Sequence, residues 1–251
     1  LETMAERMAR AGHVPERFDP TGLAPDELRR AAYQHFVRAY MRTIAGIDEN
    51  VGRLLTWLDG AGLADDTVVI YASDQGYFLG EHGYIDKRWI YEESARLPLI
   101  VRYMGEIAPG TVVDGLVIDV DFAPTLLDWA GVAVPPEPPE SPGLHGSSFR
   151  PLARGERPPG WRESLYYRYW TQEPLRPAHV GVRTRRHKLA RFYGNEVPGA
   201  PRAESWELYD LERDPLERRN VYGDPEYADV VRKLEAELER LRVQLGDEPP
   251  D

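Results

Sequence analysis

Residues 67–88 read TVVIYASDQGYFLGEHGYIDKR, and this stretch indicates both the fold and the chemistry of the chain. Its first six residues form an apolar run, which predicts a buried β-strand. Asp74 and Gln75 follow that strand, and a loop punctuated by glycines then carries His82 and Lys87. In open α/β sheets, ligands bind at the loops beyond the carboxyl ends of the strands. The stretch therefore predicts a site at a strand end, with residue types that suit a hard metal ion holding an anionic oxyester.

The composition is that of an acidic globular protein. The chain has 251 residues, 42% of them hydrophobic, and 42 acidic against 31 basic residues give a formal net charge of −11. This acidity argues against a nucleic-acid partner, because nucleic-acid binders present a basic face. The sequence contains no cysteine, so disulfides and thiolate metal sites within the chain are excluded.

The apolar runs and the first residues give no sign of a membrane segment or a leader. Runs such as residues 97–101 fall short of the roughly 20 residues that a spanning helix needs, and residues 1–8 lack the apolar core of a signal peptide. We therefore expect no membrane partner, and the compartment stays open. Because the chain starts with Leu1 rather than methionine, we expect it to begin inside a longer protein.

An α/β body is expected over residues 1–160. Apolar residues recur at three- and four-residue steps between Tyr33 and Leu58, which predicts an amphipathic helix, and Pro25 is suited to open a helix. The other elements predicted for this body are strands at 67–72, 97–103 and 112–117, and a helix capped by Asp119-Val120-Asp121 that runs to Gly131. We expect a mixed sheet flanked by helices.

A small α+β subdomain is expected over residues 161–251, beyond a proline-rich stretch at 134–143. Its predicted strands are 165–170, 179–184, 188–193 and 205–211, followed by a helix from about Pro225 through Leu241. The predicted fold class is therefore α/β, with a small C-terminal antiparallel sheet plus helix.

The residue types after the first strand favour a particular chemistry. The carboxylate of Asp74 and the amide oxygen of Gln75 suit Ca²⁺ or Mg²⁺, which prefer oxygen ligands. Lys87 is a compact positive charge that could neutralise a bound oxyanion. His82 could donate a hydrogen bond to that oxyanion or transfer a proton to a leaving group. Two oxygen ligands do not complete a coordination sphere, so further ligands are expected from elsewhere.

Each of these residues also has a structural reading. Asp74 could cap the turn after the strand, Lys87 could be a solvated charge, and His82 could brace its loop. We expect ion pairs or caps, rather than catalysis, from Glu92, Glu93 and Arg96. We expect surface or structural roles for the histidines that lack partners at ligand spacing, namely His35, His145, His179 and His187.

Four segments, in the same order along the chain, resemble the type I sulfatase family of the alkaline-phosphatase-like superfamily. Residues 40–55 (YMRTIAGIDENVGRLL) are similar to the helix before the family's metal-binding strand, and residues 67–88 to the metal and substrate segment itself. Residues 121–127 (DFAPTLL) resemble the helix that follows, and residues 206–215 (WELYDLERDP) the last strand and turn of the C-terminal subdomain. The resemblance implies part of an alkaline-phosphatase-like sandwich, in the bacterial subgroup with a C-terminal antiparallel extension.

The resemblance assigns roles to the loop residues. It implies that Asp74 and Gln75 are the family's second pair of calcium ligands and that Lys87 contacts the substrate sulfate, with His82 in the same loop. The family's nucleophile is a formylglycine made within Cys/Ser-x-Pro-x-Arg, and no such motif occurs in this sequence. The nearest spacings, residues 13–17 (HVPER) and 172–176 (QEPLR), begin with residues that cannot be modified in this way.

These expectations define three hypotheses. The first is hydrolysis of a sulfate ester or sulfamate on a sulfated small molecule or carbohydrate, with Ca²⁺ rather than Mg²⁺ as the metal. In it, an N-terminal half of the same protein supplies the formylglycine, and the isolated chain is inactive. The second is a phosphodiester or phosphonate ester hydrolase of the same superfamily. The third is a catalytically inactive fragment with a structural or binding role.

Overall fold

The computed structural model describes residues 19, 21–133, 144–171, 176–193 and 204–247. These residues form two compact units. The first holds the described part of 1–68 together with 79–85 and 103–105. The second holds 69–78, 86–102 and the described part of 106–251. None of the described helices is long and apolar enough to cross a bilayer.

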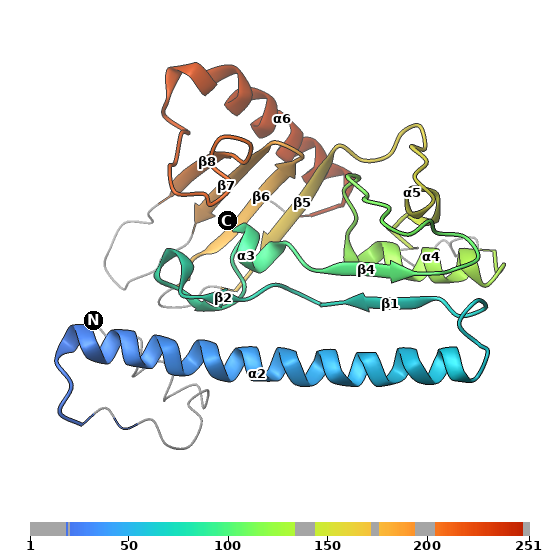
Figure 1. The fold of residues 1–251 in the computed structure, drawn as a ribbon. Coiled ribbons are helices and arrows are strands. Elements are labelled where there is room, and N and C mark those ends of the chain that lie inside the picture. Colours follow the sequence, from blue (N-terminus) through green and yellow to red (C-terminus); the bar gives the residue numbers. More distant parts are fainter. Residues whose placement is uncertain (1–18, 20, 134–143, 172–175, 194–203, 248–251) are drawn as a thin grey trace. The chain divides into compact units, whose positions relative to one another are not determined.

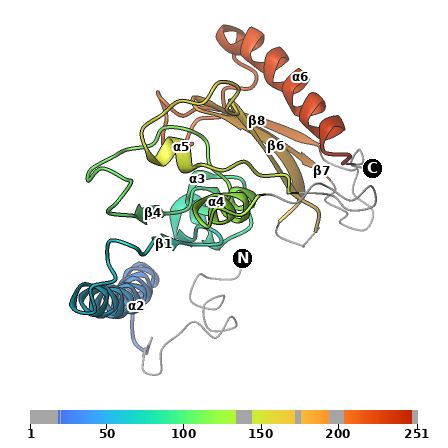
Figure 2. The same cartoon turned by 90° about the vertical axis from the view of Figure 1, so that its right-hand side faces the viewer.

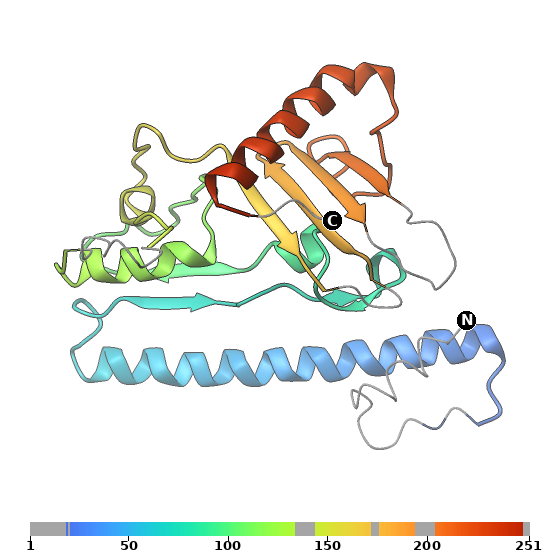
Figure 3. The same ribbon diagram turned by 180° about the vertical axis from the view of Figure 1, so that it is seen from behind.

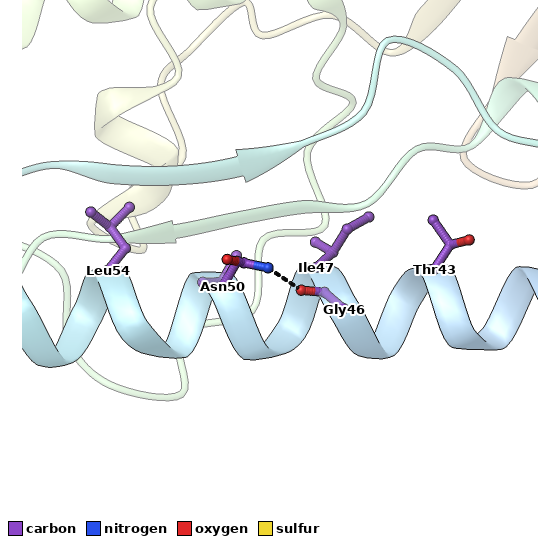
Figure 4. A pocket seen from close by; sticks show the side chains of 6 residues that line it. Thr43, Gly46, Ile47, Asn50 and Leu54 are labelled. Carbon is purple, nitrogen blue, oxygen red and sulfur yellow. Dashed lines mark hydrogen bonds between the residues drawn. The ribbon is translucent and has the colours of Figure 1, made fainter.

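The first unit is dominated by a single long helix, α2 (Pro25–Gly60). Pro25 opens it, Asp26 and Glu27 lie in its positively polarised first turn, and Gly62 follows it with a positive φ of 69°. The helix predicted for 33–58 is therefore confirmed, and it begins a little earlier. One side of α2 carries a shallow hollow between Thr43 and Leu54, where the Asn50 amide donates to the Gly46 carbonyl over 2.7 Å (Figure 4).

The predicted first strand forms, but it is not buried. Strand β1 (Val69–Ala72) pairs antiparallel with β4 (Leu99–Arg102), so that Ile70 lies opposite Val101. No residue of 67–72 is buried, and Tyr71 is 39% exposed. The prediction of a buried strand was wrong because, among the described strands, β1 has β4 as its one neighbour, and a two-stranded ladder covers little of either face.

The strand predicted at 112–117 does not form, whereas the helix after it does. Residues 111–117 join no described sheet, and Val112 is 84% exposed, because an extended segment becomes a strand only when another strand pairs with it. The helix forms as a 3₁₀ turn (Asp119–Asp121) followed by α4 (Phe122–Trp129). A short helix, α5 (Arg150–Ala153), follows.

Asp121 caps the 3₁₀ turn that leads into α4, because its carboxylate accepts the backbone N–H of Ile118, the N-cap residue of that turn, at 2.9 Å, although it makes no capping bond to α4 itself. The carboxylate is fully buried and also accepts the backbone N–H of Ser147 at 2.8 Å. Arg162 pairs with the same carboxylate. The residue therefore ties three distant segments of the second unit together.

The C-terminal part is the antiparallel sheet with a helix that the sequence predicted. Its strands β5 (Ser164–Tyr169), β6 (Ala178–Thr184), β7 (His187–Tyr193) and β8 (Ser205–Asp210) lie in sequence order. A 3₁₀ turn (Pro225–Tyr227) leads into α6 (Ala228–Gln244), which lies along one face of the sheet (Figures 1 and 3).

The two faces of this sheet bury different kinds of side chain. Because residues alternate along a strand, Val182 on β6 and Leu189 on β7 face α6, where they join one apolar cluster with Leu234 and Leu238. The intervening residues face the other way. There the ring of His179 stacks at 5.7 Å on that of Trp89, which precedes the short helix α3 (Glu92–Ala95). Figure 2 shows α3 and α6 on opposite sides of the sheet.

Candidate active site

The loop after β1, residues 73–88, carries all four residues singled out from the sequence. It contains two short strands, β2 (Phe78–Leu79) and β3 (Ile85–Asp86), which pair with each other. At its start the Ser73 hydroxyl donates to the Gln75 carbonyl over 2.7 Å, which closes a tight turn directly after the strand. Asp74 is exposed at this turn and Gln75 is half-buried.

Asp74 and Gln75 line a cleft of about 1240 Å³ that lies wholly within the second unit. The charged residues among its described lining are Asp74, Arg88, Glu92, Arg96, Asp114, Asp119, Arg183, Arg185 and Lys188. The cleft is therefore a mixed-charge site, in which oxygen donors and cations lie along the same walls. Such a site can bind an anion and a cation together.

Lys87 is held in a strained segment of backbone. It is half-buried, and its two neighbours both adopt positive φ angles, 85° at Asp86 and 84° at Arg88. Positive φ is uncommon for residues other than glycine and clusters at functional sites. The Arg88 guanidinium pairs with the Asp86 carboxylate at 2.8 Å across Lys87. Of these described residues, Arg88 lines the cleft, whereas Lys87 does not.

His82 lies in the part of the loop that belongs to the first unit. It is exposed, and its backbone is left-handed, with a φ of 53°, inside a short 3₁₀ turn (Glu81–Gly83). Its position relative to Asp74 stays a prediction.

Asp119 is a cleft residue that the sequence analysis did not assign to the candidate site. It was assigned to a helix cap, but it lines the same cleft as Asp74. Asp119 is exposed, but partial desolvation of its carboxyl raises its pKa, and the negative charges of Asp74 and Asp121 raise it further. Asp119 is therefore close enough to Asp74 for the two carboxylates to repel each other. The sequence did contain a signal for Asp119, because residues 119 and 121 are a second pair of acidic residues that follows an apolar segment.

The ligand atoms in this cleft are of the type that a hard cation prefers, but they are too few to complete its coordination sphere. Asp74, Gln75 and Asp119 all offer oxygen atoms, which Ca²⁺ and Mg²⁺ prefer. Among the described residues, no group of three or more histidine, aspartate or glutamate side chains is arranged so that it could hold a metal ion.

Family comparisons agree with the resemblance noted in the sequence. The family described as N-sulphoglucosamine sulphohydrolase, C-terminal, matches residues 80–244, and the family described as sulfatase matches residues 8–132. The two matches overlap across the second half of the 73–88 loop and the residues that follow it.

Individual relatives are similar over nearly the whole chain. An N-acetylglucosamine-6-O-sulfatase of Bacteroides thetaiotaomicron is 42% identical over 223 residues, which are 87% of this chain and 38% of the relative. The structure of BT4656 in complex with its substrate, D-glucosamine-2-N,6-O-disulfate, matches with a TM-score of 0.80 and 37% identity, over 98% of this chain and 46% of that one.

A solved structure with another named activity is more distant. The phosphonate monoester hydrolase of Agrobacterium radiobacter matches with a TM-score of 0.66 and 27% identity, over 87% of this chain and 42% of that one. The chain thus spans less than half the length of each of these three proteins.

Proposed function

The chain belongs to the sulfatase family and forms a C-terminal portion of its alkaline-phosphatase-like fold, and on this premise we propose that it takes part in hydrolysing a sulfate ester or sulfamate. The observation that carries the proposal is the 73–88 loop. It follows a strand, opens with a carboxylate and an amide beside a charged cleft, and leads into the segment that both family models match.

The loop residues divide the work of binding. We propose that Asp74 and Gln75 give oxygen ligands to Ca²⁺, with Asp119 in the same cleft as a further acidic neighbour. A bound calcium ion would neutralise charge on the sulfate group. Lys87 holds the sulfate by its positive charge. His82 donates a hydrogen bond or a proton on the leaving-group side.

The attacking group comes from outside these 251 residues. The sequence has no cysteine and no Cys/Ser-x-Pro-x-Arg motif from which a formylglycine could be made. We therefore propose an N-terminal half as the partner that supplies the nucleophile, and an isolated chain that does not turn over substrate. In this arrangement residues 1–160 complete the α/β domain and residues 161–251 form the C-terminal subdomain.

The proposed substrate is a sulfated carbohydrate, with a sulfated amino sugar as its best-supported form. This rests on the N-acetylglucosamine-6-O-sulfatase that is 42% identical and on the BT4656 complex with a disulfated glucosamine.

The test uses the complete protein that carries this chain. Replacing Asp74 with alanine should abolish aryl sulfate turnover and high-affinity Ca²⁺ binding measured by calorimetry. Asp229→Ala is the matched control, because Asp229 is a 77% exposed carboxylate on α6 whose partner is Arg232. Unchanged turnover in the Asp74 variant would refute the assignment.

A phosphonate or phosphodiester ester is the second candidate substrate, favoured by the structural match to the phosphonate monoester hydrolase. The two chemistries share an anionic tetrahedral centre, so the loop residues do not separate them. Comparing kcat/KM for an aryl sulfate, an aryl phosphonate and an aryl phosphate diester on the complete protein decides between them.

A further inference from the structure

Ser94 contacts the 73–88 loop at two points that matter for the proposed chemistry. It is 5% exposed and lies in α3. Its carbonyl accepts the Gly76 N–H at 2.8 Å, and its hydroxyl oxygen accepts the Arg88 N–H at 2.9 Å. Gly76 comes directly after the Asp74–Gln75 pair, and Arg88 directly after Lys87. One buried residue therefore holds the loop next to both of its functional ends.

The metal end of the loop also packs directly on the backbone of α3. A Cβ atom added at Gly76 would lie 2.1 Å from the Glu93 carbonyl oxygen, far inside any tolerated contact. The missing side chain is what allows the loop to reach the Ser94 carbonyl. The separation between loop and α3 is thus fixed by contact as well as by a hydrogen bond.

Helix α3 is in turn fixed by four buried or half-buried charges, Glu92, Arg183, Lys188 and Glu217, here termed the anchor cluster. The Lys188 ammonium lies 2.8 Å from Glu92 Oε1 and 2.7 Å from Glu217 Oε1. Both contacts are ion pairs, because their angles do not meet those of a hydrogen bond. The Arg183 guanidinium holds both oxygens of Glu92, at 3.1 and 3.0 Å. Two carboxylates and two cations make the cluster neutral.

Glu217 connects the cluster to the start of α3. Its Oε2 accepts the backbone N–H of Glu92, the first residue of the helix, at 2.7 Å. Its own backbone is left-handed, with a φ of 48°, a conformation that persists only where the surroundings impose it. Beside it, the Tyr91 hydroxyl donates to Glu207 on β8 at 2.8 Å. The start of α3 is therefore held by Glu207 on β8 and by Glu217 in the segment that follows β8.

We propose that Ser94 is a positioning residue, which the anchor cluster holds in place and which sets the spacing between the Asp74–Gln75 end and the Lys87 end of the loop. The inference rests on the proposed function, because the spacing matters only if the two ends of the loop bind a metal ion and a sulfate next to each other. A displacement of about 1 Å in such a site can lower the rate about a hundredfold.

The two contacts of Ser94 can be separated experimentally. Ser94→Ala removes the acceptor of the Arg88 N–H and keeps the carbonyl that holds Gly76. In the complete protein it should lower kcat/KM for an aryl sulfate about tenfold to a hundredfold. It should also speed amide exchange at Arg88 and leave Ca²⁺ affinity unchanged. Ser94→Thr keeps the hydroxyl and should recover part of the turnover.

Ser148→Ala is the matched control. Ser148 is a half-buried serine whose hydroxyl donates to Asp128 at 2.6 Å and accepts the Arg150 N–H at 3.3 Å, and neither partner belongs to the 73–88 loop. It should lower the melting temperature by as much as Ser94→Ala does and leave turnover and Arg88 exchange at wild-type values.

The outcomes separate the inference from the proposed function. The positioning role is overturned if Ser94→Ala has wild-type turnover and a wild-type rate of amide exchange at Arg88. It is also overturned if Ser148→Ala loses as much turnover as Ser94→Ala. If the unmodified complete protein hydrolyses no aryl sulfate, the proposed function fails. The rate of amide exchange at Arg88 would then still show whether Ser94 holds the Lys87 end of the loop in place.

Discussion

Replacing Gly76 with alanine tests how closely the Asp74–Gln75 end of the loop must approach α3. The added methyl group would lie 2.1 Å from the Glu93 carbonyl oxygen and 2.9 Å from its carbonyl carbon. Both atoms are backbone, so no side chain can rotate away. The loop must therefore move by roughly 1 Å, and a shift of that size in an active site costs about a hundredfold in rate.

The energetic cost follows from the same contacts. Forcing an extra carbon into a packed site costs about 1–3 kcal/mol. Losing the 2.8 Å bond from the Gly76 N–H to the Ser94 carbonyl adds about 1 kcal/mol. We expect the free energy of unfolding of the second unit to fall by about 2–4 kcal/mol, and Ca²⁺ affinity to fall with it.

Urea unfolding and calorimetric Ca²⁺ titration of the complete protein measure the two effects. Gly52→Ala is the control, because Gly52 lies inside α2 and a Cβ added there would meet nothing within 4 Å. Alanine at this position should stabilise the helix by about 0.5–1 kcal/mol. A Gly76→Ala protein with wild-type stability and wild-type Ca²⁺ affinity would show that the close approach has no role in shaping the site.

The anchor cluster and α2 give three further predictions. Lys188→Met should cost about 3–5 kcal/mol, because it leaves the buried Glu217 carboxylate without its cation and the half-buried Glu92 with Arg183 alone; adding Glu217→Gln should recover part of this loss in urea unfolding. Burial alone would raise the pKa of Glu92, but Arg183 and Lys188 outweigh it and lower that pKa to about 2 from 4.5. The resulting stabilisation is present above pH 4.5 and is lost as the pH falls toward 2, so melting temperatures of wild type and Glu92→Gln should converge over that range. The 251-residue chain should self-associate in light scattering, because α2 exposes Met41, Ile44, Ile47, Leu54 and Trp57.

Each of these predictions has a clear contrary result. A double variant no more stable than Lys188→Met alone would mean that the two carboxylates do not repel each other. Parallel melting curves for Glu92→Gln and wild type from pH 5 to pH 2 would remove Glu92 from the acid response. A monodisperse, monomeric chain would show that the exposed apolar side chains of α2 do not drive self-association.

Much of the fold is visible in the sequence because it follows local pattern. The periodicity of residues 33–58 predicts α2, and the alternation at 179–184 and 188–193 predicts the hairpin of β6 and β7. The prediction of ion pairs for Glu92 is also confirmed, by Arg183 and Lys188. His179, predicted to be structural or at the surface, is fully buried against Trp89, and burial lowers its pKa to about 4.

What the sequence does not reveal depends on contacts between distant segments. The apolar run at 112–117 has strand-like composition, but its pattern does not say whether another strand will pair with it, and no described strand does. Ser94 carries no motif, and its importance lies in two hydrogen bonds to positions 18 and 6 residues earlier. Lys188 and Glu217 lie on separate segments near the C-terminus and meet only once the sheet has formed.

The role of the anchor cluster is better explained by the orientation that it gives to α3 than by a contribution to the free energy of unfolding. Apolar residues of similar volume in place of a buried ion pair are often neutral or stabilising, and the α6 face of the same sheet is indeed filled by Val182, Leu189 and Leu208. An apolar contact, however, has no preferred direction. The Glu217 carboxylate can meet the Glu92 N–H only when α3 points one way, and this direction places the carbonyl and the hydroxyl of Ser94 against the loop. In this proposal the anchor cluster sets the direction of α3, and with it the position of the 73–88 loop, whereas the apolar α6 face of the sheet stabilises the fold.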